Sequence, residues 1–232
     1  MSQENWRRVT SDEFIDFFFE EQGAIYAWSF QYMPVGRGPA LDHMVPPDER
    51  IEMLRRTQQL VRERKVFYSD FWNSGVASSG CISAGRRGGY FAIDWNGDIT
   101  PCVFIQYAVD NIYDLYRRGG TITDALQAPL FREIRAWQKE YGYAQEAESV
   151  GNWLCPCIVR DHFEVLRDAV RRTGARPLNR EAAEALEDPD YVRGMIDYDR
   201  ELEEKTEPIW THEYAEQAQE EEARSTSDAA AN

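Results

Sequence analysis

Residues 81–102 read CISAGRRGGYFAIDWNGDITPC. Two runs of strand-forming residues, 90–94 and 99–104, flank Asn96-Gly97, a dipeptide that tolerates the positive φ angles of a hairpin turn. We therefore expect an antiparallel hairpin at this point of the chain. Such a hairpin would carry Cys102 back towards Cys81, so the stretch predicts a local fold and the meeting of two thiols.

The chain contains two further cysteines, Cys155 and Cys157, and no others. A disulfide between these two would close a small, strained ring, whereas four thiolates around one iron–sulfur cluster or one zinc ion need no such strain. Zinc sites more often place two residues between paired cysteines, so the spacing tilts towards iron and sulfur without excluding zinc. Unligated core cysteines are the third alternative.

The charges near the cysteines bear on the same choice. A metal ligand must be a thiolate, and the cations of Arg86, Arg87 and Arg160 would favour that state. The first nine residues have no apolar signal-peptide core, so we expect a cytoplasmic protein whose thiols stay reduced.

Composition excludes some classes of partner. The 232 residues are 43% hydrophobic, enough for a real core, and they carry a net charge of −15. That charge argues against nucleic acid as the main partner, and no apolar run is long enough to predict a membrane span. Much of the acidity lies in residues 201–222, which we interpret as a solvated helix face or a disordered end, with residues 225–232 disordered.

Residues 1–72 predict the order helix, strand, helix, strand. Aromatic-rich runs at 24–32 and 65–72 are typical of strands, and a helix beginning at Pro47 lies between them. Strands joined by a crossover helix are parallel. Because two strands leave unpaired edges, we expect this region to be the back end of a larger α/β domain whose front end is absent.

Two amphipathic stretches, 121–141 and 161–173, predict helices in the second half of the chain. His162 lies five residues after Cys157 and at the start of the second stretch. We favour a packing or capping role for this histidine over the role of a hydrogen-bond donor to the site or of a substitute ligand.

Residues 80–166 resemble the SPASM/Twitch auxiliary-cluster domains found at the C-terminal end of radical SAM enzymes. The resemblance rests on features in order: Cys81, a fifteen-residue spacer, Gly97, four residues and Cys102. Asn111-Ile112 follows, with Asp110 where the family usually has glycine, then residues 122–135 and the closing pair at 155 and 157. Residues 1–72 are similar to the last βα units of the radical SAM partial barrel.

This resemblance implies an α/β chain, α+β overall, in which the end of a partial βα-barrel is fused to a small cluster-binding domain of a hairpin and helices. It divides the chain into barrel units at 1–75, a SPASM/Twitch-like domain at 76–175 and an acidic helical tail at 176–232. It implies one auxiliary [4Fe–4S] cluster with the ligands Cys81, Cys102, Cys155 and Cys157.

The chain departs from the family in lacking the Cys-x3-Cys-x2-Cys loop that binds the S-adenosylmethionine cluster. We therefore expect S-adenosylmethionine to bind only if an N-terminal half polypeptide is supplied, and the chain alone to be inactive. It would be a truncated gene product or one half of a split enzyme. The intact protein would be an oxidoreductase or maturase acting on a peptide or a small molecule. The alternative is a stand-alone module that binds structural zinc and a protein partner.

Overall fold

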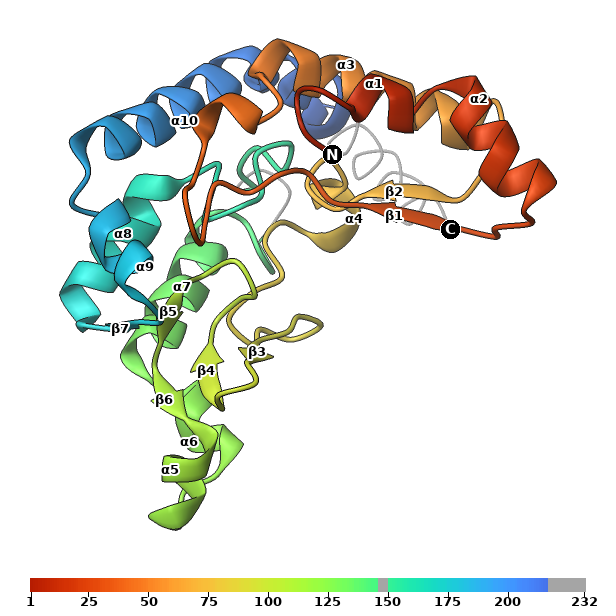
Figure 1. The fold of residues 1–232 in the computed structure, drawn as a ribbon. Coiled ribbons are helices and arrows are strands. Elements are labelled where there is room, and N and C mark those ends of the chain that lie inside the picture. The colour runs from red at the N-terminus through yellow and green to blue at the C-terminus, as the bar shows by residue number, and fades with distance from the viewer. Residues whose placement is uncertain (146–149, 217–232) are drawn as a thin grey trace, which may run out of the picture.

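The computed structural model describes residues 1–145 and 150–216 as a combination of helices and short strands (Figure 1). Helices α3 (Pro47–Arg62) and α10 (Pro189–Trp210) lie across the top of the view, with most of the strands beneath them. The predicted mixture of α and β structure is confirmed at this level. No helix among the described residues has both the length and the apolar character that crossing a bilayer requires.

The N-terminal region is a βαβ unit preceded by short helical segments. Its other elements are α1 (Trp6–Val9), α2 (Asp12–Ile15), the π-helical segment η1 (Asp16–Glu21), β1 (Ala27–Ser29), the 3₁₀ turn η2 (Leu41–His43) and β2 (Tyr68–Asp70). Strands β1 and β2 pair in parallel, with Ala27 opposite Tyr68, so the predicted βαβ unit is confirmed. Within the described residues the sheet consists of these two strands, and no barrel is formed.

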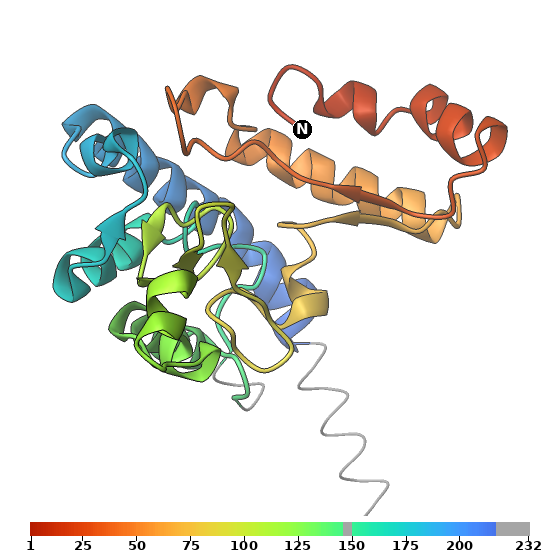
Figure 2. The same ribbon diagram turned by 60° about the horizontal axis from the view of Figure 1, so that its bottom comes forward.

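One face of this small sheet is covered and the other is not. Ile15, Leu60 and Tyr68 form a core between the sheet and the helices above it. Figure 2 shows the N-terminal segment, in red and orange, projecting to one side of the rest of the chain. On the uncovered side, the aromatic side chains of Tyr26, Trp28 and Phe67 are exposed.

The hairpin predicted around Asn96-Gly97 is present. Strand β3 (Ala92–Ile93) pairs antiparallel with β4 (Asp98–Thr100), and β6 (Asp110–Asn111) pairs with the other edge of β4. Gly97 has a φ of +87°, and the ring of Tyr113 occupies the space that a side chain there would need, so the turn requires glycine. The neighbouring elements are α4 (Gly75–Ser78), β5 (Tyr107–Ala108), α5 (Ile112–Arg117) and β7 (Arg176–Pro177), which pairs with β5.

The main core lies between this hairpin and the following helices. These helices are α6 (Ile122–Leu126), α7 (Pro129–Glu140), α8 (Phe163–Thr173) and α9 (Arg180–Ala185). The stretch 121–141, predicted as one helical region, is two helices because a Thr121–Asp124 capping box begins α6 and Pro129 begins α7. The second predicted helix is confirmed as α8, which ends at Gly174.

The acidic C-terminal region is a packed helix. Helix α10 continues into the π-helical segment η4 (Thr211–Ala215) and packs against α3 and α8. Its buried side consists of Tyr191, Met195, Leu202, Thr206 and Trp210. Glu201, Glu203 and Glu204 are exposed, so the part of the acidic run within α10 is the solvated face of a helix whose other face belongs to the core, and residues 217–222 of the run lie outside the described residues. Residues 225–232, expected to be disordered, lie outside the described residues, and the predicted domain boundaries stay predictions.

Candidate metal centre

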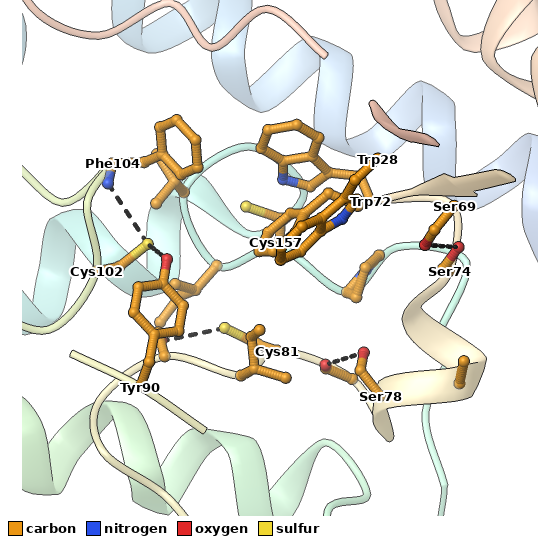
Figure 3. Close-up of a pocket in the computed structure, with 18 residues that line it drawn as sticks. Trp28, Ser69, Trp72, Ser74, Ser78, Cys81, Tyr90, Cys102, Phe104 and Cys157 are labelled. Carbon is orange, nitrogen blue, oxygen red and sulfur yellow. Dashed lines mark hydrogen bonds between the residues drawn. The ribbon is translucent and has the colours of Figure 1, made fainter. Parts of the chain in front are cut away.

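Three of the four cysteines line one cavity (Figure 3). The cavity has a volume of about 200 Å³ and lies where the end of β2, α4, the loop after β4 and the turn at 156–159 meet. Cys81, Cys102 and Cys157 approach it from three different segments. The rest of the wall is largely apolar and includes Trp28, Phe71, Trp72, Phe104, Ile158 and Val159.

Cys81 is fixed through its backbone. Its carbonyl accepts hydrogen bonds from Arg86 Nε at 2.6 Å and from Gln138 Nε2 at 3.1 Å, while its Sγ lies 3.1 Å from Ser83 Oγ. The Arg86 guanidinium thus contacts carbonyl groups and the ring of Tyr143 instead of the Cys81 sulfur. The expected stabilisation of a thiolate by the Arg86 cation is therefore not made through a direct contact with the Cys81 sulfur.

Cys102 lies in the loop that ends the predicted hairpin. Its Sγ is 2.9 Å from the Tyr90 hydroxyl and 3.5 Å from the backbone N of Phe104. Burial raises the pKa of the Cys102 thiol to about 11. A thiolate formed here by metal binding would therefore find two hydrogen-bond donors already in place.

Cys157 is held by a buried carboxylate. Its backbone N–H donates to Asp161 Oδ2 at 3.0 Å, which closes the turn after the cysteine. Burial raises the pKa of the Cys157 thiol, and the negative charge of Asp161 raises it further. Arg160 acts in the opposite direction, but its cation is shared with Asp161, which lies 3.2 Å from its Nε.

Asp161 is the centre of a fully buried ion cluster. Arg50 Nη1 and Nη2 lie 2.6 Å and 3.1 Å from its two carboxylate oxygens, and the two side chains are 2% and 0% exposed. Burial alone would raise the pKa of Asp161, but the cations of Arg50 and Arg160 overcome it and hold the pKa well below its usual range. The carboxylate is therefore an anion, matched by two arginines.

The same buried ion cluster is connected by hydrogen bonds to the ends of both parallel strands. Arg160 Nη1 donates to Gln31 Oε1 at 2.7 Å, and Gln31 Nε2 donates to both carboxylate oxygens of Asp70. Arg50 Nε also donates to Asn73 Oδ1 at 3.1 Å, just after β2. The carboxyl ends of β1 and β2 are thus hydrogen-bonded, through buried side chains, to the turn that carries Cys157.

Cys155 points away from the cavity. Its Sγ lies 3.1 Å from Thr206 Oγ1 in α10, and the residue is 1% exposed. Burial raises the pKa of the Cys155 thiol to about 12. The structure therefore places Cys81, Cys102 and Cys157 along one cavity, and Cys155, the fourth predicted ligand, is not part of the lining of that cavity.

His162 combines the two roles considered from the sequence. Its ring packs against Trp137 and Tyr141, at centroid distances of 5.0 Å and 4.4 Å, and the residue takes the N-cap position of α8 without a capping hydrogen bond from its side chain. Its Nε2 also donates to the Cys155 carbonyl at 2.8 Å. Burial lowers the pKa of His162, so the ring is neutral and serves as a backbone donor near the cysteine turn.

The donor set suits a soft metal or a cluster, because thiolates select such ions. Raised pKa values at Cys102 and Cys157 mean that binding would release protons from these thiols. Within residues 1–145 and 150–216, no three His, Cys, Asp or Glu side chains are gathered as they would be around one metal ion. The fit to a group larger than an ion rests on the three thiols around one cavity.

No protein-family model matches the chain, and no curated protein and no solved structure matches it.

Sequence reasoning missed three residues that shape the site. Tyr90 was assigned only to a strand, although it contacts the Cys102 sulfur. Arg50 shares the buried side of α3 with Met53 and Leu54, and a charge on an apolar stripe was a usable signal. Asp161, four residues after Cys157, could be placed only with knowledge of where Arg50 lies.

Proposed function

We propose that this chain binds one [4Fe–4S] cluster in the cavity lined by Cys81, Cys102 and Cys157, and that it is the C-terminal part of a radical SAM protein. The observation that carries the cluster is the convergence of these three thiols, which come from three separate segments, on one cavity. Cys155 stays the predicted fourth ligand. Thiols that remain reduced in the cytoplasm suit this role.

The size of the cavity favours a cluster over a single ion. Room for one water-sized sphere requires about 10–15 Å³, whereas this cavity measures about 200 Å³. A tetrahedral zinc site needs no comparable space, since its sulfurs lie about 2.3 Å from the metal. A bound cluster would supply one-electron transfer, and the chain's own part is to hold it and to exclude water on the aromatic side.

The uncovered face of the β1–β2 sheet supports the proposal of a missing front half. Tyr26, Trp28 and Phe67 are 60%, 55% and 67% exposed, and they lie on or next to the two parallel strands. Parallel sheets are normally covered on both faces and rarely stop at two strands. An N-terminal half polypeptide would cover these side chains and bring the S-adenosylmethionine site, and with it a peptide or small-molecule substrate.

The test is anaerobic reconstitution of the full chain with iron and sulfide. We expect about four irons per chain, broad absorbance in the blue part of the visible spectrum and an electron paramagnetic resonance (EPR) signal on reduction. The same treatment of Cys102→Ser, whose fold is checked by circular dichroism, serves as control and is expected to lower the iron content. Tight binding of one zinc ion, with no retained iron, would instead establish the zinc module.

A further inference from the structure

The indole of Trp72 is a fully buried part of the cavity wall (Figure 3). The residue is 1% exposed, and its ring packs against Phe71 and Phe104 at centroid distances of 5.0 Å and 5.3 Å. Its backbone N–H donates to Asp70 Oδ1 at 3.1 Å, just after β2. Backbone and ring are therefore both held, and the fold determines the direction in which the indole N–H points.

The indole N–H of Trp72 lacks an acceptor. Within residues 1–145 and 150–216, no atom accepts a hydrogen bond from the buried Nε1, whereas Nε1 of the buried Trp6 donates to Glu49 Oε2 at 2.6 Å. An indole N–H can only donate, and a buried donor without an acceptor costs about 1–3 kcal/mol. Because Trp72 borders the cavity, an acceptor bound in that cavity would remove this cost.

A cation over the ring makes this N–H a stronger donor. Arg160 Cζ lies 5.0 Å from the centroid of the Trp72 ring. The guanidinium is held there because its Nε contacts Asp161 at 3.2 Å and its Nη1 donates to Gln31 at 2.7 Å. A cation over an aromatic face attracts the electron density of the ring, and this polarises the N–H bond. A negatively charged acceptor therefore suits Trp72 better than a neutral one.

We infer that Nε1–H of Trp72 donates a hydrogen bond to a sulfur atom of the bound cluster and thereby raises the reduction potential of that cluster. Hydrogen bonds to the sulfurs are one of the factors that determine the potential of an iron–sulfur centre. The reduced state carries one more negative charge than the oxidised state, so a donor stabilises the reduced state more. This inference rests on the proposed function and deepens it, because it names a residue that regulates the potential of the same site.

A redox titration of Trp72→Phe tests the hydrogen bond, because phenylalanine keeps an aromatic ring and has no N–H. After anaerobic reconstitution, the ratio of reduced to oxidised cluster at a fixed potential is expected to fall about three- to tenfold, where tenfold equals 59 mV for one electron. The matched control is Trp210→Phe, which removes an indole that is 7% exposed and lies outside the cavity lining. An unchanged ratio in Trp72→Phe, or an equal fall in both variants, would overturn the inference.

A second measurement needs no change at Trp72 and decides the matter if Trp72→Phe does not fold. Tryptophan labelled with nitrogen-15 in the indole is incorporated into the unaltered chain, and the EPR signal of the reduced cluster is expected to show hyperfine coupling to an indole nitrogen. Trp28→Phe with the same label is expected to keep this coupling, since Trp28 is the other tryptophan in the cavity wall. Absence of the coupling, or its loss in Trp28→Phe, would overturn the inference. Failure of the unaltered chain to assemble any cluster would instead refute the proposed function.

Discussion

Replacing Asp161 by asparagine removes the one anion that Arg50 and Arg160 share, with almost no change in volume. Arg50 donates to both oxygens of this carboxylate, at 2.6 Å and 3.1 Å, and both side chains are buried. Removing one partner of a buried ion pair costs about 3–5 kcal/mol, because the remaining charge is left without compensation. Here two cations lose their counter-ion, so we expect a loss in the free energy of unfolding of at least about 3 kcal/mol.

Urea unfolding of the metal-free protein, followed by circular dichroism, measures this loss by linear extrapolation. The matched control is Asp114→Asn, which breaks the Arg117 pair, whose side chains are 74% and 59% exposed. That change is expected to cost less than about 1 kcal/mol. Since a domain of this kind has only about 5–15 kcal/mol in total, Asp161→Asn is expected to lower the urea midpoint strongly.

The result that would refute this reasoning is a loss no larger than that of Asp114→Asn. It would mean that the charges of Arg50 and Arg160 are compensated by other groups. It would also mean that the buried ion cluster around Asp161 is not what holds the strand ends and the Cys157 turn together. A variant that is already partly unfolded without urea would agree with a loss in the free energy of unfolding of about 5 kcal/mol or more.

Three further changes test other parts of the site. Burial raises the pKa of Asp199 to about 9, so its contribution to the free energy of unfolding falls as pH rises from about 4 towards 9. Asp199→Asn is therefore expected to become more stable relative to the unaltered chain over that range, as measured by urea unfolding at about pH 4 and about pH 9. A stability difference between the two proteins that is the same at both pH values would contradict this. Tyr90→Phe removes a donor to the Cys102 sulfur and is expected to lower the reduction potential of a reconstituted cluster by roughly 40 mV in a redox titration, whereas an unchanged potential would show that the hydroxyl does not contact the thiolate. Gly75→Ala places a methyl group against the Trp153 carbonyl oxygen and 2.8 Å from Pro156 Cβ, and it is expected to cost about 1–3 kcal/mol of stability and to reduce iron retention; normal values of both would show that the turn adjusts freely.

Local patterns predicted the βαβ unit and the hairpin, because each is set by neighbouring residues. Asn96-Gly97 determines its own turn, and Pro47 begins α3 as expected. Pro129 was an equally local signal that the helical stretch divides in two, and it was not used. Element type was therefore readable wherever turn and cap residues act over a few positions.

The candidate site was readable only in part, because its geometry depends on residues far apart in sequence. The spacing of Cys81 and Cys102 around a hairpin predicted that both would face one place, and both line the cavity. The adjacent pair looked equivalent by spacing, yet Cys155 and Cys157 face different partners because Thr206 lies behind one of them. No local pattern around the pair could reveal a contact made by α10.

Helix α10 also determines how far the chain can be shortened. Tyr191 donates to the carbonyl of Pro34, Tyr198 to that of Val45, and Asp199 accepts from the N–H of Phe163. A version of the protein that stops before residue 189 would lose all three contacts and would bare the underside of α3. Helix α10 belongs to an acid-rich region that composition alone would mark as dispensable, yet it connects the N-terminal unit to the cysteine-bearing half.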